Sequence, residues 1–230
     1  MPPASAADDP KAWPFPPAPF AVIAGTRRRS WANPTSWISH RIFDRATGHD
    51  GTVAVTETKL DGMAAFETID ASHTTIMHDP RVHALGSLDE TNAAIGHVRS
   101  ALNVCTDVGL VVDARLSDVQ NWLFDVGAKL TTNTKGDFSA KVLEMEGWID
   151  GWEETLPELK NFILPAGTEA VSRIHLARAV SRRAERWLVD SASADWSLPL
   201  INRLSDMLFV LARYINYVNG VEEVIWKSGG

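Results

Sequence analysis

The stretch at residues 171–190, VSRIHLARAVSRRAERWLVD, limits most narrowly what this chain can fold into. It is rich in Ala, Leu, Arg and Glu and contains neither Gly nor Pro, a composition that predicts a helix. Four polar residues recur at spacings of three, four and three, which places them on one helical face: His175, Arg178, Arg182 and Glu185. The adjoining face is apolar and holds Ile174, Ala177, Ala184 and Leu188.

This polar stripe has two interpretations. A solvated helix face with an internal ion pair is the more common origin of such a pattern. The alternative is an anion-binding site, in which Arg183 lies beside the stripe and Glu185 acts as an acceptor. The rest of the chain has to decide between the two.

Helical spacing of apolar residues recurs in five segments and predicts a bundle. The predicted helices cover about 87–102, 110–132, 140–155, 169–191 and 198–219. The first is expected to open with a capping box formed by Ser87 and Glu90, with Asp89 also in its first turn, where carboxylates suit the helix dipole. Few segments have the alternation of a strand. The sequence therefore predicts an all-α fold, an antiparallel five-helix bundle.

The last predicted helix also carries polar residues on a second face: Asn202, Ser205, Asp206 and Asn216. Polar side chains on a helix that is otherwise apolar need hydrogen-bond partners wherever they are buried. Solvation at the surface is the more common explanation for such a face.

Composition and charge exclude several classes of function. The chain has 230 residues, 45% hydrophobic and 22% charged, which is ordinary for a globular protein. A net charge of −7 provides no basic field for nucleic acid, so an anionic ligand needs a local cluster of cations. Cys105 is the only cysteine, which excludes an intramolecular disulfide and a Cys-based zinc site and fits a reducing compartment. No apolar run approaches the roughly 18–20 residues that span a bilayer, so no membrane partner is predicted.

Residues 1–40 differ from the rest of the chain. They hold eight of the twelve prolines and show no periodicity, so we expect an irregular Pro-rich extension, followed by one domain at 41–230. The arginines at 27–29 favour a presequence for the mitochondrial matrix, because such segments are Arg-rich and acid-poor. Asp8 and Asp9 argue against it. An equal alternative to a presequence is a disordered tail, or a tail that packs on a partner subunit. In that case the protein is expected in the cytoplasm.

A glycine-containing loop follows the extension. Residues 41–79 are predicted to be loop with short extended pieces, and their most distinctive segment is RATGHDGT at 45–52. Its glycines and threonines could turn the backbone tightly and present N–H and hydroxyl groups to an anion: Thr47, Gly48, Gly51 and Thr52. Taken alone, such a loop is more often a simple turn than a phosphate-binding loop.

Five blocks of sequence, in order, resemble the PduO-type ATP:cob(I)alamin adenosyltransferases. They are RVHALGSLDETN at 81–92, LFDVGA at 123–128, FILPAG at 162–167, HLARAVSRRAER at 175–186 and NRLSDMLFVLAR at 202–213. The segment GVEEVIWK at 220–227 is also similar to the family, and the glycine loop extends the resemblance faintly to about residue 41. So many blocks in the same order are not expected by chance.

The resemblance implies a five-helix bundle that assembles as a homotrimer, with active sites between adjacent subunits. It implies transfer of the 5′-deoxyadenosyl group of ATP to the reduced cobalt of cobalamin, with release of triphosphate. Co(I) is a strong nucleophile that needs no general base, so the protein mainly positions two substrates and stabilises charge on the triphosphate. Arginines and Mg²⁺ suit that task. An adenosylcobalamin-dependent enzyme is the implied acceptor of the product. No metal site made by protein side chains alone is predicted.

The resemblance also implies which residues contact ATP. From the two last helices these are Arg182, Arg183, Glu185, Asn202 and Ser205, and from the glycine loop they are Arg45, Thr47, Gly48, Gly51 and Thr52. The loop departs from the family pattern at two positions. Ala46 replaces a residue that is commonly basic, and His49 replaces a common Asp. Arg45 is expected to substitute for the missing basic residue if the backbone shifts by one position.

For cobalamin, the resemblance implies three residues. Arg178 is expected to pair with Asp89 across a subunit interface and to shape the corrin pocket. Phe162 is expected to press on the lower face of the corrin, where an apolar ring excludes water and the dimethylbenzimidazole base from cobalt. Four-coordinate Co(II) is easier to reduce to Co(I), so this packing would assist catalysis. The candidate catalytic residues are therefore Arg182, Phe162, Arg178 and Asp89.

Three hypotheses of function follow from these residues. The first is an active adenosyltransferase, favoured by the complete set of polar residues on the two last helices. The second is a catalytically weakened paralogue that binds or delivers cobalamin, suggested by Ala46 and His49. The third is a helical assembly module without turnover.

Overall fold

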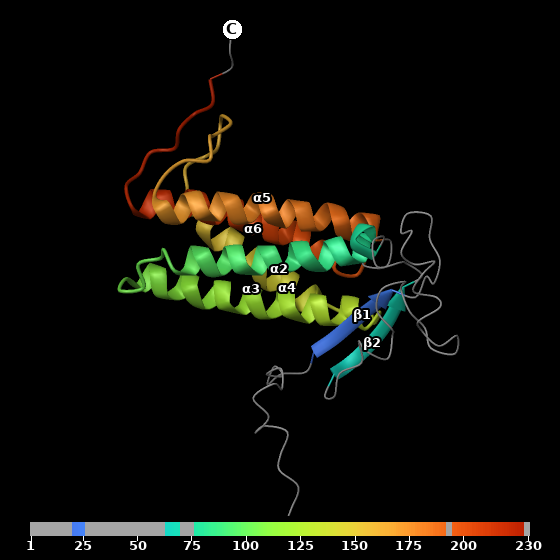
Figure 1. Cartoon of the computed structure of the whole chain (residues 1–230). Coiled ribbons are helices and arrows are strands. Elements are labelled where there is room, and N and C mark those ends of the chain that lie inside the picture. Colours follow the sequence, from blue (N-terminus) through green and yellow to red (C-terminus); the bar gives the residue numbers. More distant parts are fainter. Residues whose placement is uncertain (1–19, 26–62, 70–75, 192–194, 228–230) are drawn as a thin grey trace, which may run out of the picture. The chain divides into compact units, whose positions relative to one another are not determined.

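The computed structural model describes residues 20–25, 63–69, 76–191 and 195–227 (Figure 1). By its internal contacts the chain divides into two compact units, Met1–His73 and Thr74–Gly230. The described part of the first unit consists of two strands, and that of the second contains the helices.

The first unit contains a small parallel sheet. Strand β1, Phe20–Gly25, pairs with β2, Met63–Ile69, and the register is irregular between Phe20 and Ala21. The expectation of an irregular extension is therefore wrong at residues 20–25. The local sequence FAVIAG is apolar and includes two β-branched residues, which favour a strand when a second strand is available for pairing. Strand β2 is one of the short extended pieces expected between residues 41 and 79.

The second unit confirms the predicted helical bundle. A short 3₁₀ helix, η3 (Ile76–His78), precedes five α-helices. These are α2 (Pro80–Arg99), α3 (Asp107–Thr131), α4 (Ser139–Glu153), α5 (Glu169–Asp190) and α6 (Leu198–Val218). Helix α5 packs against α2 and α6, α3 packs against α2, and α4 packs against α6 (Figure 1).

Helix α2 begins seven residues earlier than the sequence predicted. Asp79 caps it, since its Oδ1 accepts a hydrogen bond from the backbone N–H of Arg81 at 2.8 Å, and Pro80 occupies the first turn. This arrangement suits proline, which has no N–H to leave unsatisfied there. The predicted capping box is therefore wrong, because Ser87 lies buried within the helix. Asp89 and Glu90 stand in the middle of α2, where the helix dipole gives them no stabilisation.

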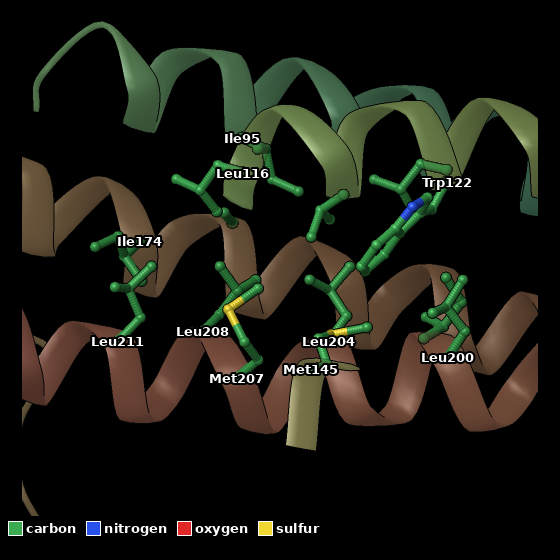
Figure 2. Packing of buried hydrophobic residues seen from close by; sticks show 14 of the residues in the cluster. Ile95, Leu116, Trp122, Met145, Ile174, Leu200, Leu204, Met207, Leu208 and Leu211 are labelled. Atoms are coloured by element: carbon green, nitrogen blue, oxygen red, sulfur yellow. The ribbon is translucent and has the colours of Figure 1, made fainter. Parts of the chain in front are cut away.

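Helix α6 is the most buried of the five α-helices, with 12 of its 21 residues buried. Its apolar side chains, among them Leu204, Leu208 and Leu211, point into the interior that Ile95 and Leu116 enter from other helices (Figure 2). Apolar residues recur along α3 at alternating spacings of four and three, as a helix with one buried face requires, and all of them are buried: Val112, Leu116, Val119, Leu123, Val126 and Leu130. Each large side chain that is fully buried contributes about 1.5–3 kcal/mol, so burial of this core is the main favourable contribution to the packing of the helices.

Helix α5 buries the first residue of its polar stripe. His175 is 7% exposed, and its Nδ1 has no hydrogen-bond partner among the described residues. Burial lowers the pKa of His175 below the usual 6.5, and the positive charge of Arg178 lowers this pKa further. The fold therefore favours the neutral form of this imidazole.

We predict that the free energy of unfolding decreases as the pH falls below about 6.5 and that His175 causes part of the decrease. The pKa of His175 is lower in the folded chain than in the unfolded chain, so burial of the neutral imidazole costs no protonation energy above pH 6.5. Its contribution to the free energy of unfolding is therefore present in full there. That contribution is lost as the pH falls through the folded pKa. Denaturant unfolding at pH 7.5 and at pH 5.5 measures the change.

The variant His175→Leu removes this titration, so the difference in stability between the two pH values should become smaller. His97→Gln provides the control, since His97 is exposed and on α2. An unchanged difference in His175→Leu would contradict the assignment.

Candidate functional site

Two arginines of α5, one turn apart, form the most charged part of the site. The guanidinium of Arg178 is half-buried over the ring of Phe209, 5.9 Å from its centroid, and its Nε has no hydrogen-bond partner among the described residues. Burial lowers the pKa of Arg178, and the charge of Arg182 lowers it further. Arg182 is exposed, and no described carboxylate pairs with it. Like charges four residues apart destabilise a helix, so an anion at this position would relieve a local cost.

Arg183 points toward α2 and pairs with Glu90. On the same two helices the rings of His83 and Trp187 stack, with centroids 4.1 Å apart and planes 11° from parallel. Together the two contacts show that α2 and α5 run antiparallel. They also hold the helices in a defined register, because an aromatic pair contributes about 0.5–1.5 kcal/mol beyond its burial. Glu90 is a partner that the sequence did not predict for Arg183.

Glu185 joins α5 to the second turn of α6. Its Oε1 accepts a hydrogen bond from Nδ2 of Asn202 at 2.7 Å. The two residues are 17 positions apart in the sequence and lie on different helices. Their hydrogen bond therefore fixes the end of α5 against the start of α6. Arg182 lies one turn before Glu185 on the same face. Of the predicted ATP contacts, these three therefore lie close together.

Other predicted residues are placed differently. Ser205 is only 3% exposed, so its hydroxyl lies below the surface that carries Asn202. Asp89 is exposed on α2 and forms no ion pair with Arg178 within the chain. The predicted ATP contacts of the glycine loop lie outside the described residues, as do the two positions that depart from the family pattern: Arg45, Ala46, Thr47, Gly48, His49, Gly51 and Thr52.

Phe162 lies on the linker between α4 and α5 and is 79% exposed. Its nearest aromatic neighbour is Trp226 of the C-terminal segment, with ring centroids 6.1 Å apart and planes at 82°. The two rings border a hollow of about 430 Å³, together with Leu159, Lys160 and Asn161. The sequence predicted Phe162 but not its neighbour, although Trp226 stands in a block that resembles the family.

The described part of the chain contains no group of three or more His, Cys, Asp or Glu side chains arranged to hold a metal ion. Nor is any of its helices long and apolar enough to cross a membrane. An Mg²⁺ ion that arrives with ATP requires no such group, because phosphate oxygens and water supply most of its ligands.

Comparison with known proteins gives consistent matches. The family model for cobalamin adenosyltransferase matches residues 62–215. A corrinoid adenosyltransferase from Mycobacterium tuberculosis is 37% identical over 204 residues, which cover 83% of this chain and 94% of that protein. The corrinoid adenosyltransferase MMAB of Mus musculus is 39% identical over 164 residues, covering 65% of this chain and 68% of that protein.

A solved structure is also similar. It is a Phe-to-Ala variant of the PduO-type ATP:corrinoid adenosyltransferase from Lactobacillus reuteri, complexed with cobalamin and ATP. The TM-score is 0.61 at 34% sequence identity, and the match covers 66% of this chain and 88% of that one. The helical bundle, the clustered polar residues and these matches agree. The chain belongs to the cobalamin adenosyltransferase family.

Proposed function

We propose that the protein transfers the 5′-deoxyadenosyl group of ATP to the cobalt of cob(I)alamin, giving adenosylcobalamin and triphosphate. Membership of the cobalamin adenosyltransferase family supports this reaction. The observation that carries it is the pair of arginines, Arg178 and Arg182, whose repulsion no carboxylate of the described chain offsets. A triphosphate is an anion of sufficient charge to offset that repulsion.

ATP is proposed to bind where α5 ends and α6 begins. Arg182 is free to contact the triphosphate, and Arg183 would exchange its ion pair with Glu90 for a phosphate oxygen. The carboxylate of Glu185 and the amide of Asn202 provide acceptors and donors for the nucleoside. Ser205, Arg45, Thr47, Gly48, Gly51 and Thr52 are proposed to complete the site. Mg²⁺ is proposed to enter bound to the phosphates.

The chemistry is a nucleophilic displacement at carbon. The electron pair of Co(I) attacks C5′ of ATP, the cobalt–carbon bond forms, and the bond from C5′ to the triphosphate oxygen breaks. The electron pair of that bond leaves with the triphosphate, so no proton transfer is needed. Arg182 would stabilise the charge that develops on the leaving oxygen, which is how a fixed cation lowers such a barrier.

The corrin is proposed to lie against Phe162. The linker and the C-terminal segment expose a group of apolar side chains: Phe162 at 79%, Trp226 and Ile225 at 51%, Val224 at 47% and Leu164 at 42%. Exposed apolar side chains grouped on two paired segments are typical of a ligand or protein contact. The ring of Phe162 would exclude water and the lower base from cobalt and so favour reduction of Co(II).

We propose a homotrimer in which two subunits form each active site. Arg182 lies fourteen residues beyond the cap of α5 at Thr168, roughly 21 Å along the helix. The linker that carries Phe162 extends away from the helices at the start of α5 (Figure 1). One chain thus keeps its residues for ATP and for corrin apart, which supports a site completed by a second copy. The unpaired Nε of Arg178 and the exposed Asp89 support an ion pair across that interface.

The catalytic domain is proposed to span residues 41–230, preceded by an extension at 1–40. The arginines at 27–29 support import into the mitochondrial matrix, whereas Asp8 and Asp9 argue against a presequence and leave a cytoplasmic location as the alternative. Of the two we propose the matrix, and microscopy of residues 1–40 fused to a fluorescent protein checks it. An adenosylcobalamin-dependent enzyme is the proposed acceptor of the product.

The direct test is adenosylation with Mg-ATP and chemically reduced cobalamin. We expect a cobalt–carbon bond and one triphosphate per turnover. Absence of product from pure, trimeric protein would contradict the proposal. Turnover only at unusually high ATP concentration would instead indicate the weakened paralogue that Ala46 and His49 suggest. An assembly module predicts no thermal shift with ATP, whereas a ligand at 100 times its Kd adds about 2.7 kcal/mol.

We predict that Arg182→Ala abolishes turnover without destabilising the chain. The cation for the leaving triphosphate is lost, but so is its repulsion of Arg178, which is worth about 0.2–0.5 kcal/mol in a helix. Turnover is measured beside the unfolding free energy in the absence of ATP. Lys135→Ala is the control, since it removes an exposed positive charge from a loop far along the sequence. Wild-type turnover in Arg182→Ala would refute its role.

We predict that Phe162→Ala slows the reaction most when cob(II)alamin and a reductant are supplied. Without the ring, water or the lower base reaches cobalt and reduction becomes harder. Pre-formed cob(I)alamin bypasses that step, so its rate should change little. Leu143→Ala, which shortens a side chain that is 67% exposed on α4, should leave both rates unchanged. Equal losses with the two substrates would argue against this function of Phe162.

A further inference from the structure

The linker and the C-terminal segment hold each other as a short antiparallel pair. Ile163 forms a β-bridge with Ile225. The backbone N–H of Trp226 donates to the carbonyl of Phe162 at 2.7 Å, and that of Leu164 donates to the carbonyl of Val224, also at 2.7 Å. The backbone of Phe162 is therefore bonded to the C-terminal segment and not to any of the helices.

Arg213 of α6 attaches both segments to the bundle. It is only 5% exposed. Its Nε donates to Oε1 of Glu223 in the C-terminal segment at 2.6 Å, and its Nη2 donates to the carbonyl of Pro157 in the linker at 2.8 Å. Hydrogen bonds from a buried guanidinium are strong and directional, so one side chain defines where both segments leave the bundle.

Asn216, one turn further along α6, attaches the other end of the linker. It is 3% exposed, its Nδ2 donates to the carbonyl of Ala166 at 3.1 Å, and its Oδ1 accepts from the N–H of Thr168 at 3.4 Å. Its own carbonyl accepts from the N–H of Val221 at 2.9 Å. Gly167 permits this approach: its φ is +145°, and a Cβ there would lie 2.1 Å from Oδ1 of Asn216.

Close packing does not hold these segments in place. A hollow of about 380 Å³ lies beside Arg213 and is lined in part by Leu156, Pro157, Tyr217 and Glu223. The exposed apolar residues of both segments likewise have little cover from the bundle. The position of Phe162 therefore depends on a few polar contacts made by α6.

We propose that Arg213, assisted by Asn216, is a positioning residue for the corrin: it sets the place of Phe162 by holding the linker at Pro157 and the C-terminal segment at Glu223. This proposal rests on the proposed function, in which Phe162 contacts the lower face of the corrin. Arg213 touches no substrate and acts through the paired segments. A misplacement of about 1 Å at a reacting centre is enough to reduce a rate severely.

The test releases the C-terminal segment without emptying the core. Glu223→Ala removes the acceptor for Nε of Arg213, and Glu223→Gln returns an acceptor oxygen at the same place. Glu222→Ala is the matched control, since Glu222 is exposed and no described residue pairs with it. Rates are measured with cob(II)alamin plus reductant and with pre-formed cob(I)alamin. Electron paramagnetic resonance measures how much bound Co(II) is four-coordinate.

We expect Glu223→Ala to lower the cob(II)alamin rate by roughly tenfold or more and to reduce the four-coordinate signal. In Glu223→Ala the cob(I)alamin rate and the KM for ATP should stay within about twofold of wild type. Glu223→Gln should recover most of the lost cob(II)alamin rate. Glu222→Ala should behave as wild type. Arg213→Lys, which retains the charge but not the two-pronged geometry, should reproduce the loss if it remains folded. In a double-mutant cycle, Phe162→Ala with Glu223→Ala should lose no more than Phe162→Ala alone.

A wild-type ratio of the two rates in Glu223→Ala would overturn the proposal, and so would losses that simply add in the double variant. Failure of the proposed function is distinguishable from these results. It would appear as absent turnover in the wild-type protein, or as equal losses with both substrates in Phe162→Ala, before any change is made to Glu223.

Discussion

The burial of α6 is the constraint on which the rest of the structure depends. More than half of this helix is buried, and it packs against both α4 and α5. Near its start Asn202 donates to Glu185, and near its end Arg213 and Asn216 bond to the linker and the C-terminal segment. The apolar core thus makes α6 a rigid support with a polar contact group near each end. One group lies with the proposed ATP residues and the other with Phe162.

The charged residues of the candidate site destabilise the bundle locally. Two arginines one turn apart repel each other, and burial disfavours the charge on Arg178 and the protonated form of His175. None of this stabilises the bundle. A core as extensive as this one tolerates such a cost, because the side chains buried around α6 contribute several times as much. Charge repulsion and shifted pKa values of this kind are common at functional sites.

Much of the bundle could be predicted because apolar spacing in a helix is a local property. The buried face of α3 follows its periodicity at each predicted position. The start of α2 was missed because Ser87 and Glu90 resemble a capping box, whereas Asp79 and Pro80 form the better cap. Contacts between distant segments were not predictable. Asn216 was recognised as a polar residue that needs partners, but those partners lie about fifty residues away, and the pairing of Phe162 with Trp226 spans still more. The roles of the site residues come from resemblance, not from spacing.

We propose that ATP and cobalamin are held by separate groups of residues on one rigid framework. Calorimetric titration of the purified protein with Mg-ATP and with cobalamin tests it most directly, using the wild type and the variants Arg182→Ala and Phe162→Ala. We predict that the wild type binds both ligands, that Arg182→Ala loses ATP but binds cobalamin, and that Phe162→Ala retains ATP but binds cobalamin more weakly. Loss of both ligands in either variant, or unchanged ATP binding by Arg182→Ala, would contradict the account.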